Sequence, residues 1–208
     1  VMATGVWLRD WDGRKPGQEP RLHVRPAKGV HVAIPWLRIR NDCTVTIPVP
    51  GRSRRATITR WGDVSYLGTP EEDYAGGLDD VHSTRTELDF LLEGARSALK
   101  VDLSPEDVVG SIAGWRPLVG PPGGKTVEMK RNHEIHVAAD GLVTIVGGKL
   151  TTSRHMAEQT VDAVEKLLGR RTRCTTTSAF VLGAAGYDAQ AITATGGLSA
   201  HLGERYGT

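Results

Sequence analysis

The stretch Gly147-Gly148-Lys149-Leu150-Thr151 combines residue types that suit anion binding. It follows an apolar run at residues 142–146 and precedes a segment with helical spacing, so we expect a strand, a glycine turn and a helix start. The first turn of a helix has free backbone N–H groups and a partial positive charge, and Lys149 adds a full charge. The pattern predicts a site for an anion or an electron-rich carbonyl. An ordinary strand-to-helix turn with an exposed lysine fits it equally well.

His31 follows a glycine turn and enters a strand in which Val30 and Val32 point to the opposite face. If the face of His31 lines a cavity, its neutral imidazole can accept a proton near neutral pH. A partly exposed strand histidine without a catalytic role fits the same pattern. The sequence leaves both interpretations open.

Arg116 lies after two small residues, Ala113-Gly114, and before Pro117, which fixes the backbone. Its rigid fork of donors suits bidentate capture of a phosphate or a carboxylate, although a structural ion pair explains it equally well. Arg131 opens a polar segment that contains two histidines, but no third ligand follows at a suitable spacing. We therefore expect no metal site.

The elements that must position these residues form a mixture of strands and helices, which indicates an α/β or α+β architecture. The first strands predict an antiparallel sheet of about four strands, with a short hairpin turn at residues 62–63. A capping box of Thr84 and Glu87 marks the first helix. We expect strands at 22–35 (around a turn at 26–29), 44–49, 55–61, 64–69, 107–115, 127–137 and 142–146, loops at 8–20 and 117–125, and helices at 84–99, 151–168 and 188–206.

The composition sets the limits on function. With 208 residues, 39% hydrophobic and 24% charged, the chain suits one large or two small globular domains. Its net charge of +2 is too near neutral to imply a nucleic-acid partner. Two distant cysteines fit a reducing cytoplasm, and no apolar run approaches the roughly 20 residues that span a bilayer. Because the chain begins abruptly within a predicted strand, we expect it to be a piece of a longer protein.

Five strings of residues carry a family resemblance: Ala3-Thr4-Gly5-Val6-Trp7, Lys28-Gly29-Val30-His31-Val32, Tyr66-Leu67-Gly68-Thr69 with the later Asp73-Tyr74, Ala113-Gly114-Trp115-Arg116-Pro117-Leu118 and Gly147-Gly148-Lys149-Leu150-Thr151-Thr152. In their order and spacing they resemble the flavin-dependent (aerobic) glycerol-3-phosphate dehydrogenases of bacteria and mitochondria. In this family an N-terminal GxGxxG segment holds the ADP moiety of FAD, and no such segment occurs here. The resemblance therefore implies a partial chain that is inactive in isolation.

The resemblance implies part of a glutathione-reductase-like FAD domain, an antiparallel-sheet substrate domain and the start of a helical C-terminal domain. FAD-domain segments would occupy residues 1–25 and 126–172, the substrate domain 26–125, and the C-terminal domain 173–208. The implied activity is oxidation of sn-glycerol 3-phosphate to dihydroxyacetone phosphate, with electrons passing through FAD to quinone. The implied location is the cytoplasm, peripheral on the inner membrane, with membrane contact and a homodimer among the partners.

The resemblance also implies roles for individual residues. His31 and Arg116 would be catalytic, with His31 a base or hydroxyl orienter, and Arg116, Arg131 and Lys149 would bind the substrate phosphate. The cofactor would contact Ala3, Thr4, Gly5, Gly147, Gly148, Lys149, Leu150 and Thr151. A related flavoprotein oxidase of amino acids or N-methyl amines is the alternative, as is an inactive fragment that cannot hold FAD alone. One arginine for a carboxylate would suit such an oxidase, whereas several cations suit a phosphate dianion.

Overall fold

The computed structural model describes residues 1–9, 22–49, 51, 55–68, 72–74, 76–121, 129 and 131–206. By their contacts the described residues form two compact units, Val1–Met156 and Ala157–Thr208. Parts of the predicted loops at 8–20 and 117–125, and of the predicted strand at 127–137, lie outside the described residues.

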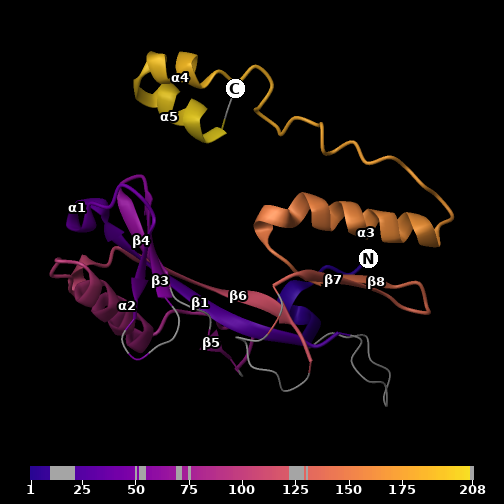
Figure 1. Ribbon diagram of the computed structural model, residues 1–208, viewed down its shortest axis with the longest axis horizontal. Coiled ribbons are helices and arrows are strands. Elements are labelled where there is room, and N and C mark those ends of the chain that lie inside the picture. The colour runs from indigo at the N-terminus through magenta and orange to yellow at the C-terminus, as the bar shows by residue number, and fades with distance from the viewer. Residues whose placement is uncertain are drawn as a thin grey trace. The chain divides into compact units, whose positions relative to one another are not determined.

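The first unit is built on an antiparallel sheet (Figure 1). The long strand β1 lies inside this sheet, because it pairs with β4 and β5 along one edge and with β6 along the other. Residues of β1 are therefore held by neighbours on both sides. Among the described residues the sheet has six strands: β1 (Val24–Pro35), β2 (Val45–Pro48), β3 (Arg55–Trp61), β4 (Val64–Gly68), β5 (Glu72–Asp73) and β6 (Gly110–Val119).

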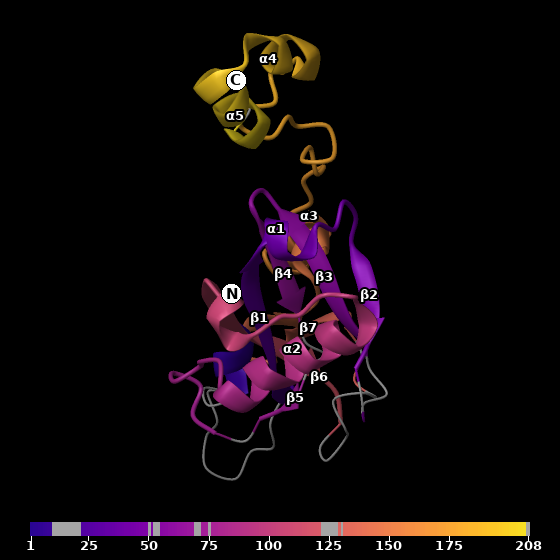
Figure 2. The same cartoon turned by 90° about the vertical axis from the view of Figure 1, so that its left-hand side faces the viewer.

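Helix α2 (Arg85–Ala98) covers one face of this sheet, as Figure 2 shows. The predicted capping box is present: Thr84 Oγ1 accepts from the Glu87 N–H at 3.3 Å, and Glu87 Oε2 accepts from the Thr84 N–H at 2.7 Å. The period of two in β1 sends Val30 and Val32 into the core beneath α2. It sends His31 to the opposite face. The core also contains Ile34, Ile47, Val49, Ala56, Ile58, Leu67, Leu91, Leu92, Ala95 and Leu103.

A smaller sheet joins β7 (His133–Val137) to β8 (Val143–Gly147) in antiparallel register. Met2 forms a parallel bridge to Thr144, with its N–H donating to the Val143 carbonyl at 2.7 Å and its carbonyl accepting from the Ile145 N–H at 2.9 Å. A 3-10 turn, η1 (Gly5–Arg9), follows the N-terminal segment. Because the two segments run parallel, the ends at Gly5 and Gly147 lie at the same edge.

The chain leaves β8 through the turn η4 (Leu150–Thr152) and enters α3 (Ser153–Leu167). Two short helices follow in the second unit, α4 (Ala189–Thr195) and α5 (Gly197–Tyr206). Asp188 Oδ1 accepts from the N–H groups of Gln190 and Ala191 and so caps α4. Within the part of the chain that the structure describes, no helix has the length and hydropathy to cross a bilayer.

Several predicted boundaries are wrong. The turn predicted at residues 26–29 is absent, because β1 continues through it. Pro26 lies directly opposite Pro117 in the β1–β6 ladder. Proline has no backbone N–H group, so both missing donors lie at the same position of the ladder and the pairing continues on either side of it. Strand β6 extends to Val119, into the predicted loop, while β5 and the short helix α1 (Trp36–Ile39) were not predicted.

The apolar residues of α3 are only partly buried. Thr160 is buried, but Val161, Leu167 and Leu168 are exposed. Apolar residues at helical spacing specify a stripe on the helix without specifying what covers it.

Candidate functional site: a histidine–arginine pair and a glycine turn

His31 lies half-buried on the face of β1 that points away from α2. Its ring lies over Gly68, the residue directly opposite in β4, since a Cβ atom on Gly68 would be 2.5 Å from His31 Cδ2. Burial, and then the positive charge of Arg116, lower the pKa of His31 below its ordinary value. The imidazole is therefore neutral at neutral pH and able to accept a proton.

Arg116 reaches the same face from the neighbouring strand. It lies directly opposite Ala27 in the β1–β6 ladder, and opposite residues of an antiparallel pair point to the same side. Its guanidinium lies over Gly29: a Cβ atom there would be 2.9 Å from Arg116 Cζ and 3.1 Å from Nη2. The structure thus brings His31 and Arg116 together, which the sequence alone had left undecided.

The other face of β1 holds this strand in place. Lys28, beside Gly29, is buried, and its Nζ donates to Glu87 Oε2 at 2.8 Å. Burial raises the pKa of Glu87, but hydrogen bonds from Lys28 and Thr84 outweigh it and the pKa is lowered overall. This ion pair joins β1 to the first turn of α2, a contact that sequence reasoning missed because its partners are far apart in the chain.

Trp115 fixes strand β6 next to Arg116. Its Nε1 donates to the Leu78 carbonyl at 2.8 Å, and its ring lies 4.4 Å from the ring of Tyr74, centroid to centroid. These contacts lie on the face opposite to the Arg116 side chain, since neighbouring residues of a strand alternate. They therefore hold the backbone of Arg116 without occupying the space in front of it.

The predicted strand, glycine turn and helix start are present at the end of β8. Gly147 and Gly148 have φ values of 80° and 79°, in the left-handed region that favours glycine. A Cβ atom on Gly147 would be 2.8 Å from the Asn132 carbonyl oxygen, and one on Gly148 would be 2.5 Å from Met156 Sδ. The turn therefore requires glycine at both positions on grounds of conformation and of space.

The residues after the turn stand open to a ligand. Lys149 is exposed, and Leu150 is 90% exposed. Thr152 Oγ1 donates to the Lys149 carbonyl at 2.9 Å and accepts from the Lys149 N–H at 3.4 Å, which fixes the turn internally. The helical structure begins as a 3-10 turn at Leu150, one residue earlier than predicted.

Arg131 and Lys149 flank one end of the smaller sheet. His133 pairs with Gly147, so Arg131 comes two residues before this pair and Lys149 two residues after it. The four predicted cationic or basic side chains thus form two groups, His31 with Arg116 on the large sheet and Arg131 with Lys149 at the glycine turn.

Strand β6 connects the two groups. It carries Arg116 and ends at Val119, whose Cγ2 atom would be 3.1 Å from a Cβ atom on Gly147. Val119 also packs in an apolar cluster with Met2 and Val146, which places the N-terminal segment and β8 beside the end of β6. Ala3, Thr4 and Gly5, predicted to contact a cofactor, follow Met2 at the same edge as the glycine turn.

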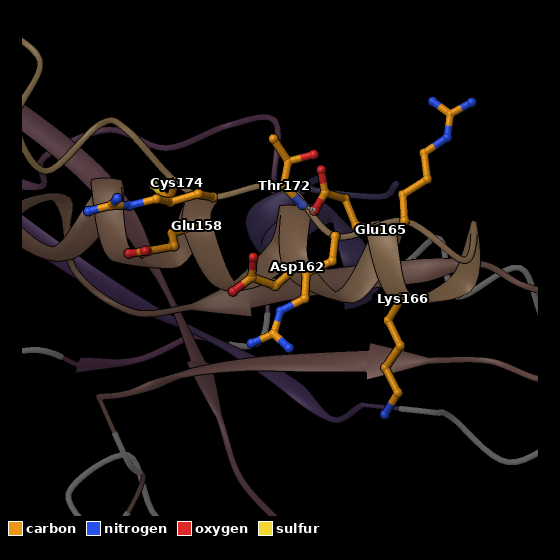
Figure 3. A pocket seen from close by; sticks show the side chains of 9 residues that line it. Glu158, Asp162, Glu165, Lys166, Thr172 and Cys174 are labelled. Atoms are coloured by element: carbon orange, nitrogen blue, oxygen red, sulfur yellow. Dashed lines mark hydrogen bonds between the residues drawn. The ribbon is translucent and has the colours of Figure 1, made fainter.

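Two of the hollows among the described residues are lined by other side chains. One, of about 270 Å³, has a basic lining that includes Arg9, His23 and Arg25. The other, of about 750 Å³, lies on the second unit between α3 and the segment that follows it (Figure 3). There Glu165 Oε2 accepts from the Thr172 N–H at 2.6 Å. Neither hollow is lined by a predicted site residue.

The glycine turn fits the electron-rich end of a flavin. Such a ring accepts hydrogen bonds from backbone N–H groups at a helix start, and the two exposed residues Lys149 and Leu150 follow the glycines there. Lys149 adds a positive charge to the same turn.

A glycine turn that leads into an exposed helix start, and a neutral histidine beside an arginine, suit a flavin-dependent oxidoreductase. Residues 1–163 match the family described as FAD dependent oxidoreductase, and the chain belongs to that family. Over its whole length it is 33% identical to glycerol-3-phosphate dehydrogenase 1 of Mycobacterium tuberculosis, of which the match covers 40%. It is 32% identical to the probable mitochondrial glycerol-3-phosphate dehydrogenase of Caenorhabditis elegans, a match that covers 88% of this chain and 26% of that protein.

Solved structures agree with this membership. The chain is similar to the glycerol-3-phosphate dehydrogenase of Bacillus halodurans complexed with FAD, with a TM-score of 0.80 and 25% identity over 99% of this chain and 42% of that one. Glycine oxidase from Bacillus cereus has a TM-score of 0.50 and 18% identity over 86% of this chain and 44% of that one, which shows likeness of fold alone. The predicted fold class, mixed α/β with antiparallel sheets in a flavoprotein, is confirmed. The chain spans about two fifths of the length of the first of these relatives.

Proposed function

We propose that this chain is part of an enzyme that oxidises sn-glycerol 3-phosphate to dihydroxyacetone phosphate with FAD. The observation that carries the proposal is the His31–Arg116 pair, a neutral base beside a cation on one face of the sheet. The names of the relatives in Mycobacterium tuberculosis and Bacillus halodurans support the choice of substrate.

The chemistry requires a hydride to leave C2 of the substrate and a proton to leave the C2 hydroxyl. FAD, when bound, would supply the hydride acceptor. His31 accepts the proton of the C2 hydroxyl, so the C–H and O–H bonds break as the carbonyl forms. The lowered pKa of His31 keeps the imidazole neutral and ready for that proton at neutral pH.

Arg116 would bind the phosphate through charge-assisted hydrogen bonds, with Arg131 and Lys149 supplying further positive charge for the dianion. Lys149 would also serve the flavin, together with Ala3, Thr4, Gly5, Gly147, Gly148, Leu150 and Thr151. The exposure of Lys149 and Leu150, directly after the glycine turn, supports this cofactor assignment.

The domain division 1–25, 26–125, 126–172 and 173–208 is part of the proposal. The bridge between Met2 and Thr144 supports the joining of the first and third segments into one FAD domain. Quinone as electron acceptor, a cytoplasmic site peripheral to the inner membrane, and a homodimer are proposed from the family resemblance. Reduction of a soluble quinone, cosedimentation with vesicles and analytical ultracentrifugation would test them in turn.

The experiment that tests the activity is reduction of an artificial dye by the flavin-loaded protein that contains this chain together with an ADP-binding GxGxxG segment. With glycerol 3-phosphate we expect turnover, and with glycerol a kcat/KM lower by at least about 100-fold, since buried charge-assisted hydrogen bonds to the phosphate would be missing. Equal rates with both substrates would contradict the arginine assignment. Faster turnover with glycine or an N-methyl amine would favour the amino-acid or amine oxidase alternative.

A further inference from the structure

Two glycines lie beneath the two side chains of the proposed site. Gly68 of β4 lies under the His31 ring, and Gly29 of β1 lies under the Arg116 guanidinium. Neither has a positive φ, so the backbone itself would accept an alanine at either position. What excludes a side chain is the neighbour: a Cβ atom would be 2.5 Å from His31 Cδ2 in one case and 2.9 Å from Arg116 Cζ in the other.

Other glycines on the same face show that this crowding is local. Gly114 lies opposite Gly29 in the ladder, and a Cβ atom there would have no neighbour within 4 Å. Gly110 lies opposite Ala33, and a Cβ atom there would make only an ordinary contact with Ala33 Cβ at 3.9 Å. The absence of a side chain therefore matters at Gly29 and Gly68 because of what lies over them.

We propose that Gly29 and Gly68 are positioning residues for the oxidation, with Gly68 setting the place of the His31 imidazole and Gly29 that of the Arg116 guanidinium. This inference rests on the proposed function for its catalytic meaning. The geometry places the two side chains on one diagonal across three strands: Arg116 from β6 reaches over Gly29 of β1, and His31 of β1 reaches over Gly68 of β4.

Substitution at either glycine has a specific consequence. The atoms that a new methyl group would meet belong to the far ends of side chains, so those ends can swing aside while the sheet stays folded. In Gly68→Ala the new methyl group displaces the imidazole of His31 from its half-buried position into solvent. The pKa of His31 then rises toward the ordinary 6.5, because burial no longer opposes the charged form. In Gly29→Ala the guanidinium moves and the phosphate loses a fixed partner.

The first test needs no flavin. Histidine-labelled NMR on the 208-residue chain measures the pKa of His31, whose signal is identified by its loss in His31→Gln. Among the side chains that the structure describes, Arg116 from β6 and Tyr66 from β4 are ionisable neighbours of His31 on this face, and neither is changed in Gly68→Ala. We expect a higher His31 pKa in Gly68→Ala and an unchanged one in Gly110→Ala, the control for adding a methyl group to this sheet. An unchanged His31 pKa in Gly68→Ala, with the fold intact by thermal unfolding, would overturn the role of Gly68.

The second test uses the flavin-loaded protein. Displacing a catalytic group by about 1 Å costs on the order of 100-fold, so we expect Gly68→Ala to lower kcat with little change in KM. Gly29→Ala should raise KM for glycerol 3-phosphate with a smaller effect on kcat. Equal losses in Gly29→Ala, Gly68→Ala and Gly110→Ala would overturn the proposal in favour of general damage to the sheet. A shifted His31 pKa in a protein whose parent form does not oxidise glycerol 3-phosphate would contradict the proposed function and leave the seating of His31 established.

Discussion

Arg116 and His31, on adjacent strands β6 and β1, are electrostatically coupled: the guanidinium lowers the pKa of the imidazole, second only to the effect of burial. One positive charge thus acts on a neighbouring base and remains available to an anion. In the proposed reaction the same arginine would hold the phosphate and keep His31 unprotonated. This coupling makes the two residues one unit, whose effects on catalysis we expect to be non-additive.

The coupling predicts how His31 titrates. Its pKa should lie below the ordinary 6.5, and Arg116→Met should raise it only part of the way, since burial is the larger cause. Histidine NMR titration measures both values. A His31 pKa at or above 6.5 in the unsubstituted chain would contradict the geometry.

The same lowered pKa predicts a dependence of stability on pH. As the pH falls below about 6.5, the unfolded chain takes up a proton at His31 before the folded chain does, so the free energy of unfolding decreases until the folded-state pKa is passed. Urea denaturation at a series of pH values measures this loss. The control is His31→Gln, in which the decrease over that window should be smaller; an identical pH profile would count against the prediction.

The ion pair of Lys28 with Glu87 predicts a loss of stability on substitution. Lys28→Met leaves the Glu87 carboxylate largely buried without its cation, which should raise the Glu87 pKa and cost about 3 kcal/mol. Urea unfolding measures the cost. Arg85→Gln is a matched control on the same helix, because its pair with Asp89 is exposed and should be worth no more than about 0.5 kcal/mol. Equal losses in the free energy of unfolding for the two substitutions would show that burial of the Lys28–Glu87 pair does not affect stability.

The crowding at Gly147 predicts that alanine is more destabilising there than at Gly141, a glycine with a similar backbone conformation. Gly141 and Gly147 have similar φ values, 84° and 80°, but a Cβ atom on Gly141 has no neighbour within 4 Å. Gly141→Ala should therefore cost about 1 kcal/mol, for the left-handed conformation alone. Gly147→Ala should cost about 2–4 kcal/mol, since the Asn132 carbonyl cannot move without disturbing the backbone. Urea denaturation measures the loss in the free energy of unfolding for each variant. Equal losses for Gly141→Ala and Gly147→Ala would contradict the crowding at Gly147.

The fork of Arg116 predicts a difference between arginine and lysine. Arg116→Lys keeps the charge but loses the planar pair of donors, so we expect KM for glycerol 3-phosphate to rise on the order of tenfold in the flavin-loaded protein. Steady-state kinetics measure the change. Arg85→Lys, on the helix behind the sheet, is the control and should leave KM unchanged. An unchanged KM in Arg116→Lys would mean that the phosphate is bound elsewhere.

Local signals in the sequence were sufficient for several elements. The capping box at Thr84, the hairpin around Gly62 and the turn at Gly147 depend on residues close in the chain, and the structure shows all three. Each has a short-range physical cause: a side chain that caps a helix, or a glycine that accepts a positive φ.

Long-range features could not be predicted from the same signals. Whether Pro26 ends a strand depends on Pro117 facing it, and whether His31 is catalytic depends on Arg116 and Gly68 surrounding it. Periodicity places His31 on a face but does not say what shares that face. The family motifs contained Gly29, Gly68, His31 and Arg116, yet only their packing shows why the glycines accompany the other two.

The alternation along β1 has a consequence for how this site can be altered. Lys28 anchors the strand to the helix behind it, while Gly29 and His31 face the other way, so inserting or deleting one residue here would exchange the two sets. The side chain of His31 would then point into the apolar core beneath α2, and that of Lys28 would point to the face that carries Arg116. Redesign of the proposed site must therefore proceed by replacing side chains, because the length of this segment is not free to vary.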